Sequence, residues 1–99
     1  MFKSLDTQHL EMPFEVTVPM TDEEILEAVK PYVSAAKDLA ELELEEKLEN
    51  AVYPRFGYTT AQVFENSDEY EVFLRQALAE EVEEYEESLI RVIKAAMPQ

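Results

Sequence analysis

The sequence predicts a mainly α fold, a small helical hairpin or bundle with one long C-terminal helix and an extended, β-like N-terminal arm. The apolar residues follow helical spacing from residue 21 onward, whereas near the N-terminus they alternate with other residues. A single glycine also argues against a turn-rich all-β fold. Ninety-nine residues are enough for one domain, which we divide into an arm at 1–20 and a helical part at 21–99.

The chain is strongly acidic, with 23 Asp and Glu against 8 Lys and Arg and a net charge of −15. Such a charge repels nucleic acid and anionic membrane surfaces. We therefore expect protein partners, and neither direct nucleic-acid binding nor membrane binding. The sequence shows no signal peptide and no apolar run of membrane-spanning length, so we expect the protein in the cytoplasm, or in a virion assembled there.

Residues suited to catalysis or metal binding are scarce. Cysteine is absent, which excludes thiolate ligands and cysteine nucleophiles. The one histidine, His9, lies in the arm, so the Glu-x-x-His unit of di-iron helical bundles is missing. Gly57, the only glycine, is not enough for a phosphate-binding loop. We expect no enzymatic activity, no cofactor and no metal site.

The arm has a strand-like pattern. Its apolar residues alternate with other residues, at Leu10, Met12, Phe14, Val16 and Val18. A lone strand leaves its own backbone groups unpaired. The arm therefore either packs on its own helices or adds to another chain, and we expect the second, with these five residues contacting the partner. Removing residues 1–19 would then abolish assembly and leave the helicity nearly intact.

Thr21 and Glu24 form a capping-box pattern, which predicts a helix start. Because proline removes a helical hydrogen bond, we expect a short helix over 22–30 and a second helix that begins or bends at Pro31 and ends near Ala51. This second helix carries two apolar stripes. The first is Val33, Ala36, Ala40, Leu44, Leu48 and Ala51, and the second is Tyr32, Ala35, Leu39 and Leu42. Together they form a face broader than one neighbouring helix covers.

A proline and a glycine interrupt the helical pattern at 53–58. Four residues of this turn are candidates for partner binding: Tyr53, Arg55, Phe56 and Tyr58. They either cap the helical core or form an anchor patch, since Tyr and Arg are typical of interface hot spots. A last helix follows from Asp68 to about Ala96, roughly 45 Å long at 1.5 Å per residue.

Six glutamates fall within residues 80–87 of this last helix. The candidate acidic surface consists of Glu80, Glu83, Glu84 and Glu87. Such a cluster is either a solvated helix face or a surface that binds a basic partner. In the second case the carboxylates imitate the phosphates of a nucleic acid.

The arm and the wide apolar face predict a non-catalytic structural or adaptor protein that binds protein subunits, either its own copies or a larger assembly. Residues 25–33, Ile-Leu-Glu-Ala-Val-Lys-Pro-Tyr-Val, are similar to helical proteins of the phage head–tail junction. This resemblance implies a virion connector or assembly component. The alternative is an acidic inhibitor that mimics nucleic acid and blocks a nucleic-acid-binding protein of a host defence.

Overall fold

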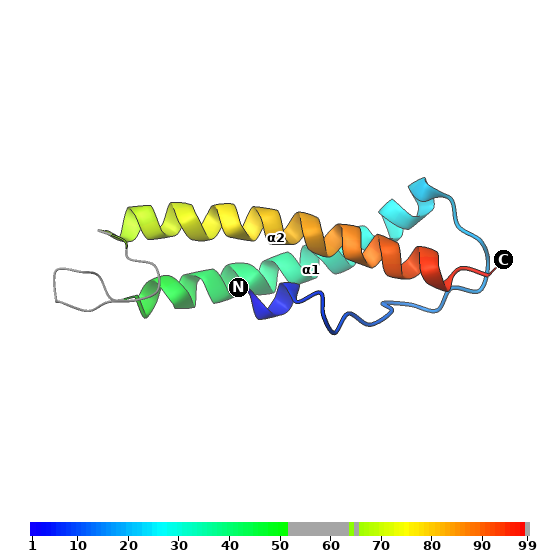
Figure 1. The fold of residues 1–99 in the computed structure, drawn as a ribbon, viewed down its shortest axis with the longest axis horizontal. Helices are drawn as coiled ribbons and strands as arrows, with labels where there is room; N and C mark the ends of the chain where they lie inside the picture. Colours follow the sequence, from blue (N-terminus) through cyan, green and yellow to red (C-terminus); the bar gives the residue numbers. More distant parts are fainter. Residues whose placement is uncertain (52–63, 65, 99) are drawn as a thin grey trace.

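A computed structural model describes residues 1–51, 64 and 66–98. It contains a short 3-10 helix, η1 (Lys3–Leu5), and two long helices, α1 (Asp22–Glu49) and α2 (Ser67–Ala96). The two long helices lie side by side and run in opposite directions (Figure 1). No β-strand occurs within the described residues. The mainly α prediction is therefore confirmed.

The start of α1 is the predicted capping box. The side chain of Thr21 accepts a hydrogen bond from the Glu24 N–H at 3.2 Å, and the Glu24 carboxylate accepts one from the Thr21 N–H at 3.1 Å. These bonds satisfy amides that no helical carbonyl reaches. Three acids in the first turn also suit the positive end of the helix dipole.

The boundary predicted at Pro31 is not a helix end, because α1 continues through it to Glu49. Pro31 is exposed, as is Glu27, one turn before it. Water can therefore reach the Glu27 carbonyl, which lacks an N–H partner at a proline. The burial of one continuous apolar stripe on both sides of Pro31 outweighs the local cost of the proline.

The start of α2 is also capped by a side chain. Asn66 accepts a hydrogen bond from the Glu69 N–H at 3.0 Å, which is the role that a short polar side chain fills at this position. Within the helix, Arg75 forms an ion pair with Glu71 at 2.8 Å. The helix begins one residue before the predicted start and ends at Ala96.

Two apolar clusters hold the helices together. The first joins the middle of α1 to the start of α2 and contains Phe2, Leu5, Ala36, Ala40, Leu44, Leu74 and Leu78. The second joins the start of α1 to the end of α2 and contains Ile25, Val29, Val33, Leu89 and Ile93. The first predicted stripe of α1 therefore faces α2.

The N-terminal arm lies along its own helices (Figure 1), which is the alternative that the sequence did not favour. Phe2 and Leu5 are only 2% and 3% exposed and belong to the first cluster. The chain then bends at 13–14 and at 18, without strand pairing among the described residues. These bends interrupt the alternation, so the arm is irregular rather than strand-like.

The molecule is elongated. It measures 59 × 20 × 16 Å, with a radius of gyration of 17.3 Å, against about 13 Å for a compact domain of this length. Within the described part of the chain, no helix is apolar enough over a sufficient length to cross a membrane.

Candidate functional site

A row of partly or largely exposed apolar side chains runs along one side of α1. It consists of Tyr32, Ala35, Leu39 and Leu42, which we call the α1 row. Tyr32, Leu39 and Leu42 are 39%, 56% and 62% exposed, and Ala35 is exposed as well. This is the second stripe predicted from the sequence. The structure buries the first stripe against α2 and leaves the α1 row open.

The spacing of the α1 row fits a second helix–helix contact. Its members are separated by three, four and three residues, which is the heptad spacing of a helix that packs on a helix. Full burial of a leucine side chain stabilises by about 1.5–3 kcal/mol. Leu39 and Leu42 therefore offer binding free energy that folding of the described chain does not use.

The arm borders the α1 row on one side. The ring of Phe14 lies 6.0 Å from the ring of Tyr32, between centroids. Further along α1, the Glu43 carboxylate accepts hydrogen bonds from the backbone of Lys3 at 2.9 Å and of Ser4 at 3.1 Å. The arm thus contacts this side of α1 at two places.

The other side of the α1 row is acidic. Beyond Leu42 the heptad spacing continues at Glu46 and Glu49. Asp38 directly precedes Leu39, Glu45 directly precedes Glu46, and both Asp38 and Glu45 are exposed. None of these four carboxylates belongs to an ion pair among the described residues. A surface of leucines beside carboxylates results.

No basic residue of α1 forms an ion pair with Asp38 or Glu45 within the described residues. Lys30 pairs with Glu27 at 2.9 Å. Lys37 lines an open groove of about 390 Å³ between the two helices, together with Arg75. Lys47 and Lys3 line a second hollow together with Glu43 and Glu46. In the described part of the chain, Asp38 and Glu45 therefore remain without an ion-pair partner, whereas Glu46 has Lys3 and Lys47 nearby.

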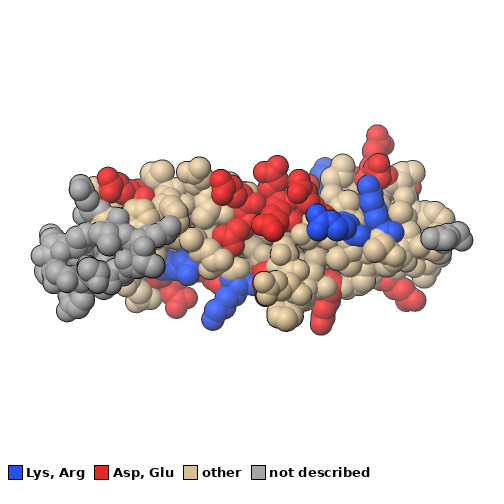
Figure 2. All heavy atoms as spheres, in the orientation of Figure 1, with Lys and Arg blue, Asp and Glu red and all other residues tan. Residues whose placement is uncertain are grey.

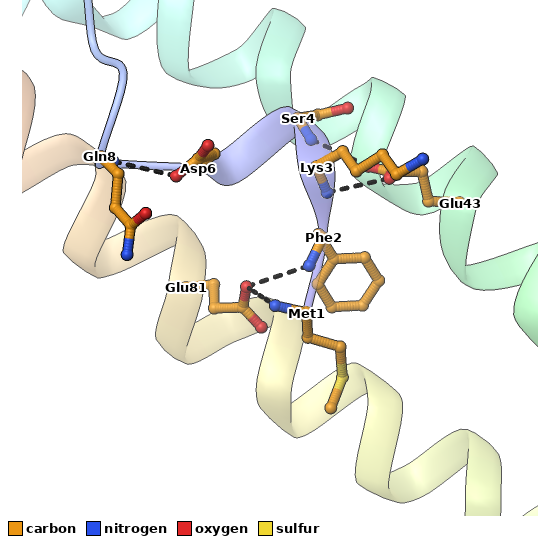
Figure 3. Close-up of polar contacts among 8 residues, drawn as sticks. All are labelled: Met1, Phe2, Lys3, Ser4, Asp6, Gln8, Glu43 and Glu81. Atoms are coloured by element: carbon orange, nitrogen blue, oxygen red, sulfur yellow. Dashed lines mark hydrogen bonds and ion pairs between the residues drawn. The ribbon is translucent and has the colours of Figure 1, made fainter.

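Two glutamates hold the start of the arm (Figure 3). Glu81 on α2 accepts hydrogen bonds from the Met1 amino group and the Phe2 N–H, both at 3.1 Å. Glu43 on α1 holds Lys3 and Ser4 from the other side. The start of the arm is thereby held between α1 and α2.

These contacts lower the pKa of Glu43. Burial, the largest single influence, raises the pKa, but it is outweighed by the hydrogen bonds from Ser4 and Lys3 and by the nearby charge of Lys47. The result lies below the ordinary value of 4.5. This role was not predictable from the sequence, because Glu43 and Lys3 are 40 residues apart.

The structure divides the five predicted arm residues into two groups. Leu10, Phe14 and Val16 are half-buried and pack on the second cluster. Met12 and Val18 are exposed. The first three therefore contribute to the protein's own core, and the last two are more exposed.

The predicted aromatic turn, Tyr53, Arg55, Phe56 and Tyr58, lies outside the described residues. Nearby, Phe64 packs against Tyr70 and Phe73 of α2, with ring centroids 5.1 Å apart in both pairs. Aromatic packing thus caps this end of α2.

The predicted acidic surface is exposed on α2. Glu80, Glu83, Glu84 and Glu87 are all accessible, and Figure 2 shows acidic side chains gathered near the middle of the molecule. Glu80, Glu84 and Glu87 follow i, i+4, i+7 spacing, so they form one line along the helix. In the part of the chain that the structure describes, no three acidic or histidine side chains converge as metal ligands.

Comparisons of the chain with known protein families, with curated proteins and with solved structures find no match.

Proposed function

We propose that this chain is a non-catalytic adaptor that binds another protein through the α1 row. The single observation that carries the proposal is the exposure of Leu39 and Leu42. These two leucines lie three residues apart on α1, whose other apolar stripe is already buried against α2. Isolated exposed leucines are ordinary on protein surfaces, but adjacent ones in heptad register favour a binding face.

The arm supports this proposal indirectly. It is fixed by Glu43 and Glu81 at one end and packs near Tyr32 through Phe14. The edge of the α1 row therefore has a defined shape in the free protein. Less conformational entropy is lost when a rigid surface binds.

Site-directed photocrosslinking in the cells that produce the protein tests the proposal. A photoreactive residue at position 39 is expected to trap one protein species. The same residue at position 72 is the matched control, because Val72 is 66% exposed but lies on α2. The pair Leu39→Gln and Leu42→Gln should abolish trapping from a probe at position 35. Equal trapping at positions 39 and 72 would contradict the proposal.

A second candidate function rests on the line formed by Glu80, Glu84 and Glu87. These exposed carboxylates favour an inhibitor that occupies the basic groove of a nucleic-acid-binding protein. Such binding loses affinity steeply as salt rises, and charge reversal to Lys at the three positions should abolish it. Binding through the α1 row should survive those reversals, which separates the two candidates.

A role in virion assembly is a narrower form of the first proposal. It rests on the resemblance of residues 25–33 to helices of the phage head–tail junction. Several of these residues, Ile25, Val29 and Val33, belong to the core. Co-purification of the chain with assembled particles, and its loss with Leu39→Gln and Leu42→Gln, tests this form.

A further inference from the structure

We infer that the partner presents an amphipathic helix whose apolar stripe packs on the α1 row and whose flank carries Lys or Arg. The inference rests on the proposed function and adds the chemistry of the partner. Two independent features of α1 point to it: the spacing of the row and the charge beside it.

The spacing selects a helix. The members of the α1 row follow one another in alternating steps of three and four residues. A helix packed on α1 matches this repeat turn by turn. A strand repeats every two residues and would meet the row at only one or two points. The row extends over about 15 Å at 1.5 Å per residue, which corresponds to nearly three turns of the partner.

The charge selects basic flanks. In heptad terms, the residues that precede Leu39 and Glu46 are Asp38 and Glu45, and both are exposed. Residues at these positions meet the flank of the opposing helix and determine which partner is accepted. The opposite flank is closed, since Ala36 is buried and Glu43 holds the arm. Both exposed charges on the open flank of the row, Asp38 and Glu45, are therefore negative.

The same charges disfavour a second copy as the occupant. In an antiparallel pairing of two α1 rows, Asp38 of one copy would lie next to Glu45 of the other, and in a parallel pairing Asp38 would meet the flank that the arm closes. Like charges across an interface disfavour that pairing. A basic helix converts each of these repulsions into an attraction.

Binding of designed peptides to the full chain tests the inference. The probe is a helix of about three heptads with Leu at the a and d positions and Lys on both flanks, so that it does not pair with itself. One reference peptide carries Glu in place of each Lys, and another has the Lys peptide's composition in scrambled order. Titration calorimetry at low and high salt measures each affinity.

The Lys-flanked peptide is expected to bind, and both reference peptides to bind at least about tenfold more weakly. Leu39→Gln with Leu42→Gln should weaken binding at least about tenfold at either salt concentration. Asp38→Asn with Glu45→Gln should weaken it about two- to tenfold at low salt only. Glu23→Gln with Glu41→Gln removes the same charge from exposed positions elsewhere on α1 and should change little.

Each other outcome overturns the inference in a different way. Equal binding of the Glu-flanked peptide, or no binding of any peptide, refutes the basic helix, while crosslinking from position 39 still tests the α1 row separately. Equal binding of the scrambled peptide, or an equal effect of the Glu23 and Glu41 substitutions, shows attraction by net charge alone. A dimer in sedimentation equilibrium that Leu39→Gln and Leu42→Gln disperse would make a second copy the occupant.

Discussion

The carboxylate of Glu43 accepts a hydrogen bond from the backbone N–H of Lys3 at 2.9 Å. Its second oxygen accepts one from Ser4 at 3.1 Å. A single side chain on α1 thus supplies acceptors for two consecutive amides that would otherwise depend on water. This contact places η1 against the helices and lets Phe2 and Leu5 enter the core.

Replacing Glu43 with Ala is expected to lower the free energy of unfolding by about 1–3 kcal/mol, because two backbone donors lose a charged acceptor. Urea unfolding followed by circular dichroism measures the change. Glu45→Ala, at an exposed position nearby, is the control and should stay within about 0.5 kcal/mol of the parent. Equal effects of the two substitutions would show that the Glu43 contact contributes nothing.

The contribution of Glu43 should also depend on pH. Its pKa is lower in the folded state than the ordinary 4.5, so below that value the unfolded chain binds the proton more readily and stability falls. The contribution is complete above pH 4.5 and is lost as the pH falls through the folded pKa. The stability difference between the parent and Glu43→Gln should therefore shrink in acid. A difference that stays constant down to about pH 3 would contradict the lowered pKa.

Phe2→Ala is expected to lower stability by about 3–5 kcal/mol, because the ring is buried between the helices. Met12→Ala lies in the same arm but is exposed, so it should cost well under that amount. Thermal and urea unfolding measure both. Removal of residues 1–19 should accordingly destabilise the helices, contrary to the sequence-based expectation that it leaves them intact.

Pro31→Ala should stabilise the protein by about 1–3 kcal/mol. The alanine restores an N–H that can donate to the Glu27 carbonyl and removes the clash of the proline ring with that turn. Ser34→Ala, also exposed on α1, controls for helix propensity and should gain only a few tenths. A loss of stability with Pro31→Ala would mean that the packing of α1 needs the geometry that the proline imposes.

Leu39→Gln with Leu42→Gln should leave stability within about 1 kcal/mol of the parent, since both side chains are mostly exposed. The same unfolding experiments check this. Leu44→Gln is the contrast, because Leu44 is 1% exposed in the first cluster, and it should lower stability by several kcal/mol. A large loss from the Leu39 and Leu42 pair would assign these residues to folding rather than to binding.

Both long helices were largely predictable, because local chemistry specifies their ends. Thr21 with Glu24 and the segment around Asn66 are start signals that depend on residues three positions apart. The wide apolar face of α1 was predictable for a similar reason. Helical spacing separates the stripe of Ala40 and Leu44 from that of Leu39 and Leu42, although spacing alone does not say which stripe faces α2.

The position of the arm was not predictable, because it depends on contacts between residues far apart in sequence. The alternation from Leu10 to Val18 predicts an extended segment but not the surface that it contacts. Its amides are satisfied near the N-terminus by Glu43 and Glu81, carboxylates 39 to 80 residues away. Propensity also predicted a break at Pro31, and the packing of a continuous stripe overrode it.

The length of the molecule, more than three times its thinnest dimension, affects how it moves through solution. A rod experiences more friction than a sphere of equal mass, so one copy of this 11.5 kDa chain should leave a gel-filtration column earlier than globular standards of its weight. Elution volume alone would thus overestimate the mass of a single copy. Light scattering or sedimentation equilibrium, which depend on mass rather than friction, should return the weight of one chain.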